Sequence, residues 1–323
     1  RGLVDVYKRQ VIYGGMADTE PVDAGTMFVM MSSTKPLTAT CLYILKERGK
    51  IGWDDLVSKY WPEFAQNGKE TVTIRHILTH RGGFPQTPES LPWTDWPDWG
   101  KVTRAMEQVP ASYTPGETMA YHPINFGWVI AEIVRRVDGR TFDRFIAEEL
   151  ASPLGMDNTY VGLPAGLEGR VSPMHLMEAD ADASGYTGTF SEPTVLRSVV
   201  PGGNGVATAG DLARFYAMMA CGGTLDGVTT LKTETVAAVT TQQSEGLDHT
   251  LDRHVKRSMG LSLGDPRSAE PGSEDTHTFG HAGSGTSIGW ANRDSGLAFA
   301  YITNGFRAEG SNCLLYTSDA ADE

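Results

Sequence analysis

Residues 31–50 read MSSTKPLTATCLYILKERGK and contain the pattern that decides the fold. A short apolar run over residues 26–31 predicts a strand. A helix is predicted over 36–48, because proline is tolerated in a first turn and Gly49 supplies a stop. Ser32 and Lys35 therefore fall at a strand-to-helix junction. At a spacing of three residues they share one face of the helical turn.

This S-x-x-K pattern has a chemical use. A serine hydroxyl is a weak nucleophile until a neighbouring base takes its proton. Lys35 can be that base if burial or a nearby cation lowers its pKa, and the start of a helix favours developing negative charge. Ser and Lys are common residues, so the strand-then-helix context, not the tetrapeptide alone, makes the pattern informative.

The whole stretch 31–64, MSSTKPLTATCLYILKERGKIGWDDLVSKYWPEF, resembles the opening of the serine β-lactamase, D-alanyl-D-alanine peptidase and related esterase superfamily. The style is closest to the class C-related, family VIII-type esterases. Three further stretches agree in the same order: IRHILTHRGGFP at 74–85, PGGNGVATAGDLARFYAMMACGGTLDG at 201–227 and FGHAGSGTSIGW at 279–290. The resemblance covers nearly all of residues 11–312.

The resemblance implies a β-lactamase/transpeptidase-like α/β (α+β) fold. In this fold an antiparallel sheet is flanked by helices, an all-helical lobe is inserted, and the active site lies between them. The sheet lobe is expected over roughly 11–35 and 205–312, and the helical lobe over roughly 36–204, within one domain.

Other elements follow from local patterns. Helices are predicted over 126–137 and over 141–150, the second after a possible Thr141 cap. A helix over 208–220 begins with Thr208 and Asp211 as a capping pair. Strands are predicted at 11–13, 290–292 and 297–303, the last two joined by a turn at 294–296. Shorter helical pieces are expected at 54–60 and 73–79, whereas 87–100 and 164–200 are expected to be loops.

Both ends of the chain look foreign to the fold. Residues 5–10 read DVYKRQ and residues 313–323 read CLLYTSDAADE. They resemble translations of the two strands of a transposon-based sequencing adapter, as in a metagenomic fragment. Residues 1–10 and 313–323 are therefore expected to be adapter-derived tails on a natural segment truncated at both ends. Compartment, whether cytoplasm or periplasm, is left open by this expectation.

The resemblance also assigns a tyrosine and its neighbours. Tyr121, in YHPINFGW, matches the tyrosine that relays a proton between nucleophile and leaving group. Relatives that act on lactams and peptides usually carry an amide-binding Asn two residues later, where this chain has Pro123. Asn125, two residues further on, is a candidate for supporting the loop beside the substrate without taking over that role. The departure favours an ester over an amide or lactam.

A third motif, His281-Ala282-Gly283, stands where relatives carry Lys-Thr-Gly or His-Thr-Gly. His281 is expected to contact substrate, and Gly283 to permit its close approach to an edge strand. By the same resemblance, the backbone N–H groups of Ser32 and Ser284 form the oxyanion hole. A neutral imidazole holds an anion less well than a lysine, which again favours an uncharged ester.

Other side chains have two interpretations. Trp93, Trp96 and Trp99 either wall an acyl pocket, with Trp93 as the candidate, or pin down their loop. His76 and His80 have the i, i+4 spacing of a zinc pair. The glutamate of HExxH is absent, however, so structural packing is the favoured interpretation.

Composition excludes several functions. The chain has 323 residues and a net charge of −13, and its basic residues are scattered, which argues against a nucleic-acid partner. No run reaches the roughly 18 apolar residues of a membrane span. Three isolated cysteines provide neither a disulfide framework nor a zinc site. No metal or organic cofactor is implied, and oligomeric state is open.

The sequence therefore predicts a serine hydrolase that forms an acyl-enzyme through Ser32, Lys35 and Tyr121. A carboxylesterase for small or medium acyl esters is the preferred activity. A D-alanyl-D-alanine carboxypeptidase or weak β-lactamase is the alternative within the family. A non-catalytic penicillin-recognition module is the alternative from another class.

Overall fold

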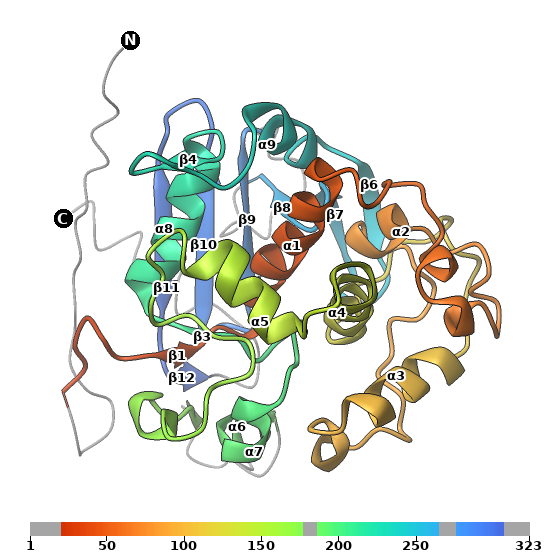
Figure 1. The fold of residues 1–323 in the computed structure, drawn as a ribbon, viewed down its shortest axis with the longest axis horizontal. Helices are drawn as coiled ribbons and strands as arrows, with labels where there is room; N and C mark the ends of the chain where they lie inside the picture. The colour runs from red at the N-terminus through yellow and green to blue at the C-terminus, as the bar shows by residue number, and fades with distance from the viewer. Residues whose placement is uncertain (1–20, 177–185, 265–275, 307–323) are drawn as a thin grey trace.

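A computed structural model of the chain describes residues 21–176, 186–264 and 276–306 (Figure 1). The predicted tails and the predicted strand at 11–13 lie outside these residues. The helices are α1 (Lys35–Glu47), α2 (Ile74–Leu78), α3 (Trp99–Gln108), α4 (Asn125–Asp138), α5 (Phe142–Ile146), α6 (Tyr186–Ser191), α7 (Pro193–Arg197), α8 (Ala209–Ala220) and α9 (Thr233–Val239). Short 3-10 turns are η1 (Met31–Thr34), η2 (Val57–Lys59), η3 (Pro62–Phe64), η4 (Trp93–Asp95) and η6 (Glu168–Arg170), and η5 (Ala147–Ala151) is a π turn.

One antiparallel sheet of six strands has the order β11-β10-β9-β8-β7-β6. Its strands are β6 (Ser244–Asp248), β7 (Arg253–Arg257), β8 (Ser262–Leu263), β9 (Thr278–Gly283), β10 (Ser287–Asn292) and β11 (Ala298–Ile302). Three two-stranded pairs accompany it. They are β1 (Phe28–Val29) with β3 (Val206–Ala207), β2 (His175–Leu176) with β12 (Gly305–Phe306), and β4 (Thr224–Leu225) with β5 (Val228–Thr229). The predicted first strand is therefore only two residues long, and it pairs with β3 outside the main sheet.

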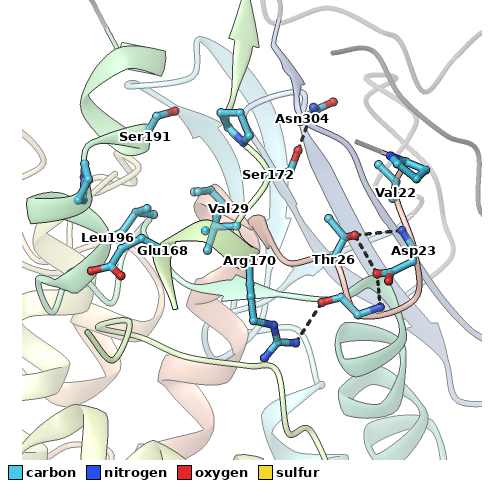
Figure 2. Close-up of a pocket in the computed structure, with 16 residues that line it drawn as sticks. Val22, Asp23, Thr26, Val29, Glu168, Arg170, Ser172, Ser191, Leu196 and Asn304 are labelled. Carbon is cyan, nitrogen blue, oxygen red and sulfur yellow. Dashed lines mark hydrogen bonds between the residues drawn. The ribbon is translucent and has the colours of Figure 1, made fainter. Parts of the chain in front are cut away.

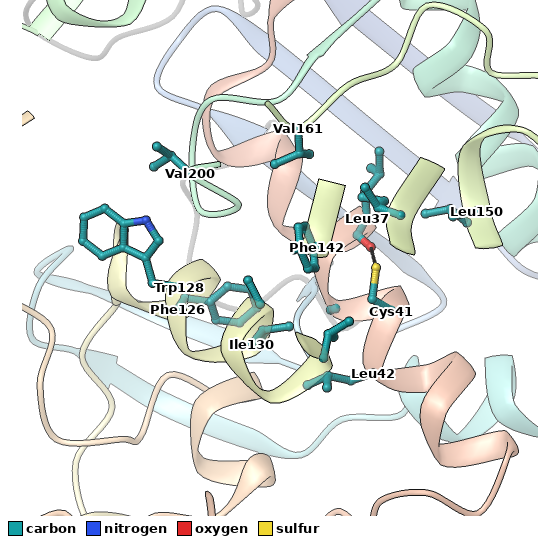
Figure 3. Close-up of a cluster of buried hydrophobic side chains, with 14 of the residues drawn as sticks. Leu37, Cys41, Leu42, Phe126, Trp128, Ile130, Phe142, Leu150, Val161 and Val200 are labelled. Atoms are coloured by element: carbon teal, nitrogen blue, oxygen red, sulfur yellow. Dashed lines mark hydrogen bonds between the residues drawn. The ribbon is translucent and has the colours of Figure 1, made fainter. Parts of the chain in front are cut away.

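Helix α1 is the centre of the molecule, since it packs against α4, α5 and α9 as well as strand β9. All residues from Lys35 to Leu45 are buried. A helix that is buried on all its faces belongs to the core of a protein. Figure 3 shows part of that core, with Leu37, Cys41 and Leu42 of α1 facing the cluster that includes Phe126 and Ile130 of α4.

Several predicted elements are confirmed nearly to the residue. Helix α4 ends at Gly139, whose φ of +92° allows the left-handed cap. Thr208 caps α8 by accepting the backbone N–H of Asp211 at 3.1 Å, and α8 packs across β10 and β11 (Figure 1). Thr141 does occupy the N-cap of α5, but its side chain makes no capping hydrogen bond.

One region departs from the prediction. Residues 164–200 were expected to lack regular structure, yet they contain α6, α7 and β2. Helices α6 and α7 are five to six residues long, too short for a helical period to show in sequence. Leu196 and Val195 of α7 are buried, so packing on the rest of the fold stabilises this piece.

Two glycines set how closely α4 approaches the loop at 201–205. A Cβ on Gly127 would collide with the backbone N of Gly202, and a Cβ on Gly202 would lie 2.7 Å from the Ile124 carbonyl oxygen. The backbones therefore touch without an intervening side chain. This contact positions two main-chain carbonyls of the active site, described below.

Gly127→Ala is expected to lower the free energy of unfolding by roughly 1–3 kcal/mol or more, because the new methyl group has no space. Gly210→Ala, in the first turn of α8, is the matched control. Its Cβ meets nothing closer than 3.7 Å, so it is expected to be neutral or to stabilise by up to about 1 kcal/mol. Urea unfolding of both variants measures the difference. Equal effects would contradict the assigned backbone contact.

Candidate active site

The S-x-x-K pair lies where predicted, at the turn that leads into α1. Ser32 is in η1 and Lys35 is the first residue of α1. Lys35 Nζ lies 3.1 Å from Ser32 Oγ, within hydrogen-bond distance. The preceding Met31 has a φ of +49°, in the left-handed region that non-glycine residues rarely adopt. Such strain is typical of a turn that presents a functional side chain.

The Lys35 amine is held by two backbone carbonyls. Nζ lies 2.6 Å from the Pro123 oxygen and 2.7 Å from the Gly202 oxygen, and the side chain is fully buried. Burial, followed by the positive charge of Arg257, holds the pKa of Lys35 well below its usual range. A neutral amine would donate its two N–H groups to the carbonyls, and its lone pair would then face Ser32. The arrangement suits Lys35 to act as a base.

Tyr121 lies beside this pair, in the segment that precedes α4. Lys35 Nζ is 4.7 Å from the centroid of the Tyr121 ring. The ring also contacts His80, at a centroid separation of 4.6 Å, and His281, at 5.9 Å. The structure thus brings together Ser32, Lys35, Tyr121 and His281 from three separate segments of the chain.

His281 is a buried, neutral acceptor. Its Nδ1 lies 2.7 Å from the carbonyl oxygen of Ala282. Because a carbonyl only accepts, Nδ1 must carry the proton and Nε2 the lone pair. Nε2 is buried with no hydrogen-bond partner among the described residues. Burial, and next the charge of Lys35, lower the pKa of His281 to about 3, so the ring is uncharged at neutral pH.

The end of β9 is fastened to the nucleophile's turn. Ser33 Oγ lies 3.0 Å from the His281 carbonyl oxygen, and Ser287 Oγ lies within hydrogen-bond distance of Ser33 Oγ and the Met30 oxygen. These contacts join the two ends of the β9–β10 turn, which contains Ser284 with a φ of +42°, to the segment that carries Ser32. Assignment of the Ser32 and Ser284 N–H groups to an oxyanion hole remains a prediction.

Gly283 lies against the turn that carries Ser32. Strand β9 lies between β8 and β10 in the sheet order, but β8 pairs only with Phe279 and Gly280, and the half of β9 that contains Gly283 is paired with β10. A Cβ on Gly283 would collide with the Met30 carbonyl and the Ser287 hydroxyl. The glycine therefore admits the backbone of the Ser32 turn on one side, and the predicted approach of substrate along this strand remains a prediction.

Asn125 also has a different role from substrate contact. It is fully buried, and its amide nitrogen donates to the carbonyl oxygens of Phe84 and Gln86, both at 2.8 Å. Both N–H groups are thereby used. Asn125 fixes the 84–86 loop against α4, which agrees with loop support and leaves no donor for a substrate.

The tryptophans divide between the two interpretations. Trp96 is buried against Trp128 and Phe190, and Trp99 Nε1 donates to Glu132 Oε2 at 2.8 Å, so both pin the loop. Trp93 is 38% exposed in η4. Its place in an acyl pocket remains a prediction.

His76 and His80 have separate structural partners. His76 forms a capping box with Thr73 at the start of α2. His80 Nδ1 accepts the backbone N–H of His122 at 3.1 Å. No group of three or more His, Cys, Asp or Glu side chains within 21–176, 186–264 and 276–306 is arranged to hold a metal. His76 therefore stabilises the start of α2, and His80 packs beside Tyr121.

The burial of His80 and His122 as neutral rings predicts how the free energy of unfolding depends on pH. Burial lowers the pKa of His122 to about 4 and that of His80 well below its usual range. Between pH 6.5 and 4 the unfolded chain binds protons that the folded chain does not, so the free energy of unfolding falls as pH falls. His122 alone contributes about 3 kcal/mol over this window. Urea unfolding at several pH values measures it.

His122→Gln is expected to flatten that slope, because glutamine does not titrate. The matched control, His254→Gln, changes an exposed residue of β7 and is expected to leave the slope as it is. A slope that His122→Gln does not alter would contradict the assignment of a neutral buried ring.

Sequence reasoning missed Asp248 and Arg257, which form a buried ion pair against Tyr121. Arg257 Nη2 lies 2.7 Å from Asp248 Oδ2, and the side chains are 3% and 0% exposed. No local motif marks either residue. The feature that the two residues share is their place in the sheet, because Asp248 ends β6 and Arg257 ends β7.

A cavity of about 680 Å³ lies elsewhere, beside β1 (Figure 2). It is lined by residues that include Asp23, Val29, Arg170 and Leu196. Ser32, Lys35, Tyr121 and His281 are not among its lining residues, so it is not the predicted site.

Among the described residues, no helix has the length and apolar character needed to cross a membrane.

Comparisons with known proteins agree with this geometry. The β-lactamase family model matches residues 2–321. The esterase/β-lactamase LipL of Mycobacterium tuberculosis (strain ATCC 25618 / H37Rv) is 32% identical, over 94% of this chain and 74% of that protein. The crystal structure of a family VIII carboxylesterase superposes with a TM-score of 0.80 at 30% identity, covering 88% of this chain and 79% of that chain.

A penicillin-binding protein homologue from Caulobacter crescentus is a further structural relative. It superposes with a TM-score of 0.76 at 30% identity, over 90% of this chain and 80% of that chain. The predicted β-lactamase/transpeptidase-like fold is thereby confirmed. The chain belongs to the β-lactamase family and is one of its serine hydrolases.

Proposed function

We propose that the protein is a carboxylesterase for small or medium acyl esters, acting through an acyl-enzyme on Ser32. The observation that carries the proposal is the buried, neutral ring of His281, which supplies no positive charge for a substrate carboxylate. Pro123 offers no side-chain donor for a substrate amide, and both Asn125 N–H groups are occupied. An uncharged ester needs neither group.

The chemistry follows from the contacts of Lys35. Neutral Lys35 takes the proton of Ser32 as the oxygen attacks the ester carbonyl, and the N–H groups of Ser32 and Ser284 are proposed to hold the resulting oxyanion. Tyr121 is proposed to pass a proton to the departing alcohol oxygen and to regain one from the Lys35 ammonium. Water then attacks the acyl-enzyme, the acid leaves, and the Ser32 hydroxyl is restored.

The test compares hydrolysis of p-nitrophenyl butyrate with hydrolysis of a chromogenic cephalosporin, with Ser32→Ala as control. We expect rapid ester turnover that the Ser32→Ala variant lacks. Lactam cleavage is expected to be slower by at least about 100-fold, because the neutral His281 does not pair with the carboxylate of the cephalosporin. Efficient lactam hydrolysis would instead assign a β-lactamase.

The family's peptidase activity is the second candidate, and resemblance to a penicillin-binding protein homologue favours it. Release of D-alanine from a D-alanyl-D-alanine peptide, without ester turnover, would support it. A folded protein whose Ser32 is labelled by neither a fluorophosphonate nor a fluorescent penicillin would be a binding module.

A further inference from the structure

The Asp248–Arg257 ion pair places two charges in the interior of the protein. Both side chains are buried at the ends of adjacent strands. Removing two charges from water costs more than their attraction commonly returns, and apolar replacements are often as stable. The contacts of this pair indicate what it contributes.

Asp248 holds the main chain of Tyr121. Its Oδ1 accepts the backbone N–H of Tyr121 at 2.9 Å, and also those of Thr250 at 3.1 Å and Leu251 at 3.2 Å. Its other oxygen binds Arg257. The carboxylate thereby joins the β6–β7 turn to the segment that carries the proposed proton relay.

Arg257 holds the ring of the same tyrosine. Its guanidinium carbon lies 5.3 Å from the Tyr121 ring centroid, and Lys35 Nζ lies 4.7 Å from that centroid. Two basic groups therefore share one aromatic ring. Since the guanidinium is always charged, a second positive charge at Lys35 is disfavoured by Coulomb repulsion.

The other groups around Lys35 offset that repulsion only in part. Burial lowers the pKa of His80, which follows α2, of His122, before α4, and of His281, in β9, so these rings are neutral and add no negative charge. Ser32 and Tyr121 are uncharged in the resting site. The buried carboxylate of Asp248 binds Arg257 and three backbone N–H groups, and its negative charge compensates part of the Arg257 charge.

We propose that Asp248 and Arg257 are positioning residues for the reaction. Asp248 fixes the main chain of Tyr121, and the permanent charge of Arg257 keeps the Lys35 amine neutral and able to accept the Ser32 proton. This inference rests on the proposed Ser-Lys-Tyr chemistry. It makes the electrostatic state of the nucleophile's base depend on the β6–β7 hairpin.

The test is the pH dependence of kcat/KM for p-nitrophenyl butyrate. If Lys35 must be neutral, kcat/KM rises with pH along an acidic limb. Asp248→Asn/Arg257→Met removes both charges without stranding a buried carboxylate, and the limb is expected to move up by about one pH unit or more. Asp248→Asn alone leaves Arg257 uncompensated, and the limb is expected to move down. Arg257→Lys retains a charge and is expected to keep the limb in place.

A merely structural role would lower kcat/KM equally at every pH, and an unmoved limb in the double variant would overturn the inference. So would a limb that Arg257→Lys moves as far as the double variant does. Should the double variant fail to melt cooperatively, the downward movement in Asp248→Asn decides. The pH profiles are interpreted only for ester hydrolysis that the Ser32→Ala variant lacks. Ester turnover that persists in Ser32→Ala would reject the proposed function and would not bear on the roles of Asp248 and Arg257.

Discussion

Lys35→Met is expected to lower kcat/KM for p-nitrophenyl butyrate by about 10³-fold or more, in the range of a lost general base. The methionine retains the length of the side chain in its buried channel but provides no lone pair for the Ser32 proton. Lys35→Arg is expected to fail equally, because a guanidinium does not give up its proton in a protein. Steady-state kinetics on folded protein measure both.

The chain offers a matched control in Lys69, a second fully buried lysine. Its Nζ also lies on backbone carbonyls, those of Gln66, Glu107 and Val109, and burial lowers its pKa to about 8. No serine lies among those partners. Lys69→Met is expected to lower the melting temperature and leave kcat of the folded fraction intact. Equal kinetic losses in the two variants would assign Lys35 a packing role.

Tyr121→Phe is expected to lower kcat by about 100-fold or more, since it removes the hydroxyl proposed to serve the departing alcohol. The phenyl ring retains the contacts with His80 and with the two basic groups at Lys35 and Arg257. Loss of kcat with little change in melting temperature is the expected signature. A leaving group of low pKa, such as p-nitrophenol, should suffer less than an alkyl alcohol.

Tyr43→Phe is the control for loss of a buried tyrosine hydroxyl. Tyr43 is fully buried in α1 and donates to the carbonyl oxygen of Met259. Removal of the Tyr43 hydroxyl is expected to lower the free energy of unfolding by about 1 kcal/mol and to leave kcat unchanged. A Tyr121→Phe variant that behaves in the same way would contradict the relay.

Much of this architecture could be predicted because its signals are local. Helix α8 begins at a Thr208 cap, α4 ends at Gly139, and β10 and β11 are joined by a polar turn. The S-x-x-K spacing places two side chains on one turn wherever that turn lies in the fold. Such features depend on a few neighbouring residues, so they are legible in one sequence.

The missed features depend on residues far apart in the chain. Gly283 and Met30 touch only after β9 is laid beside η1. The Asn125 side chain is buried because its amide nitrogen donates hydrogen bonds to the carbonyl oxygens of Phe84 and Gln86. Asp248 reaches Tyr121 across 127 positions. No period or cap announces such contacts, since tertiary packing creates them.

The anchors of the Lys35 amine are main-chain oxygens, those of Pro123 and Gly202. A main-chain carbonyl survives any substitution of the residue that carries it, provided that the backbone path is kept. The side chain at position 123, which is proposed to affect substrate preference, can therefore change while the Lys35 amine keeps its anchor. Reactivity and proposed specificity thus depend on different atoms of the same residue.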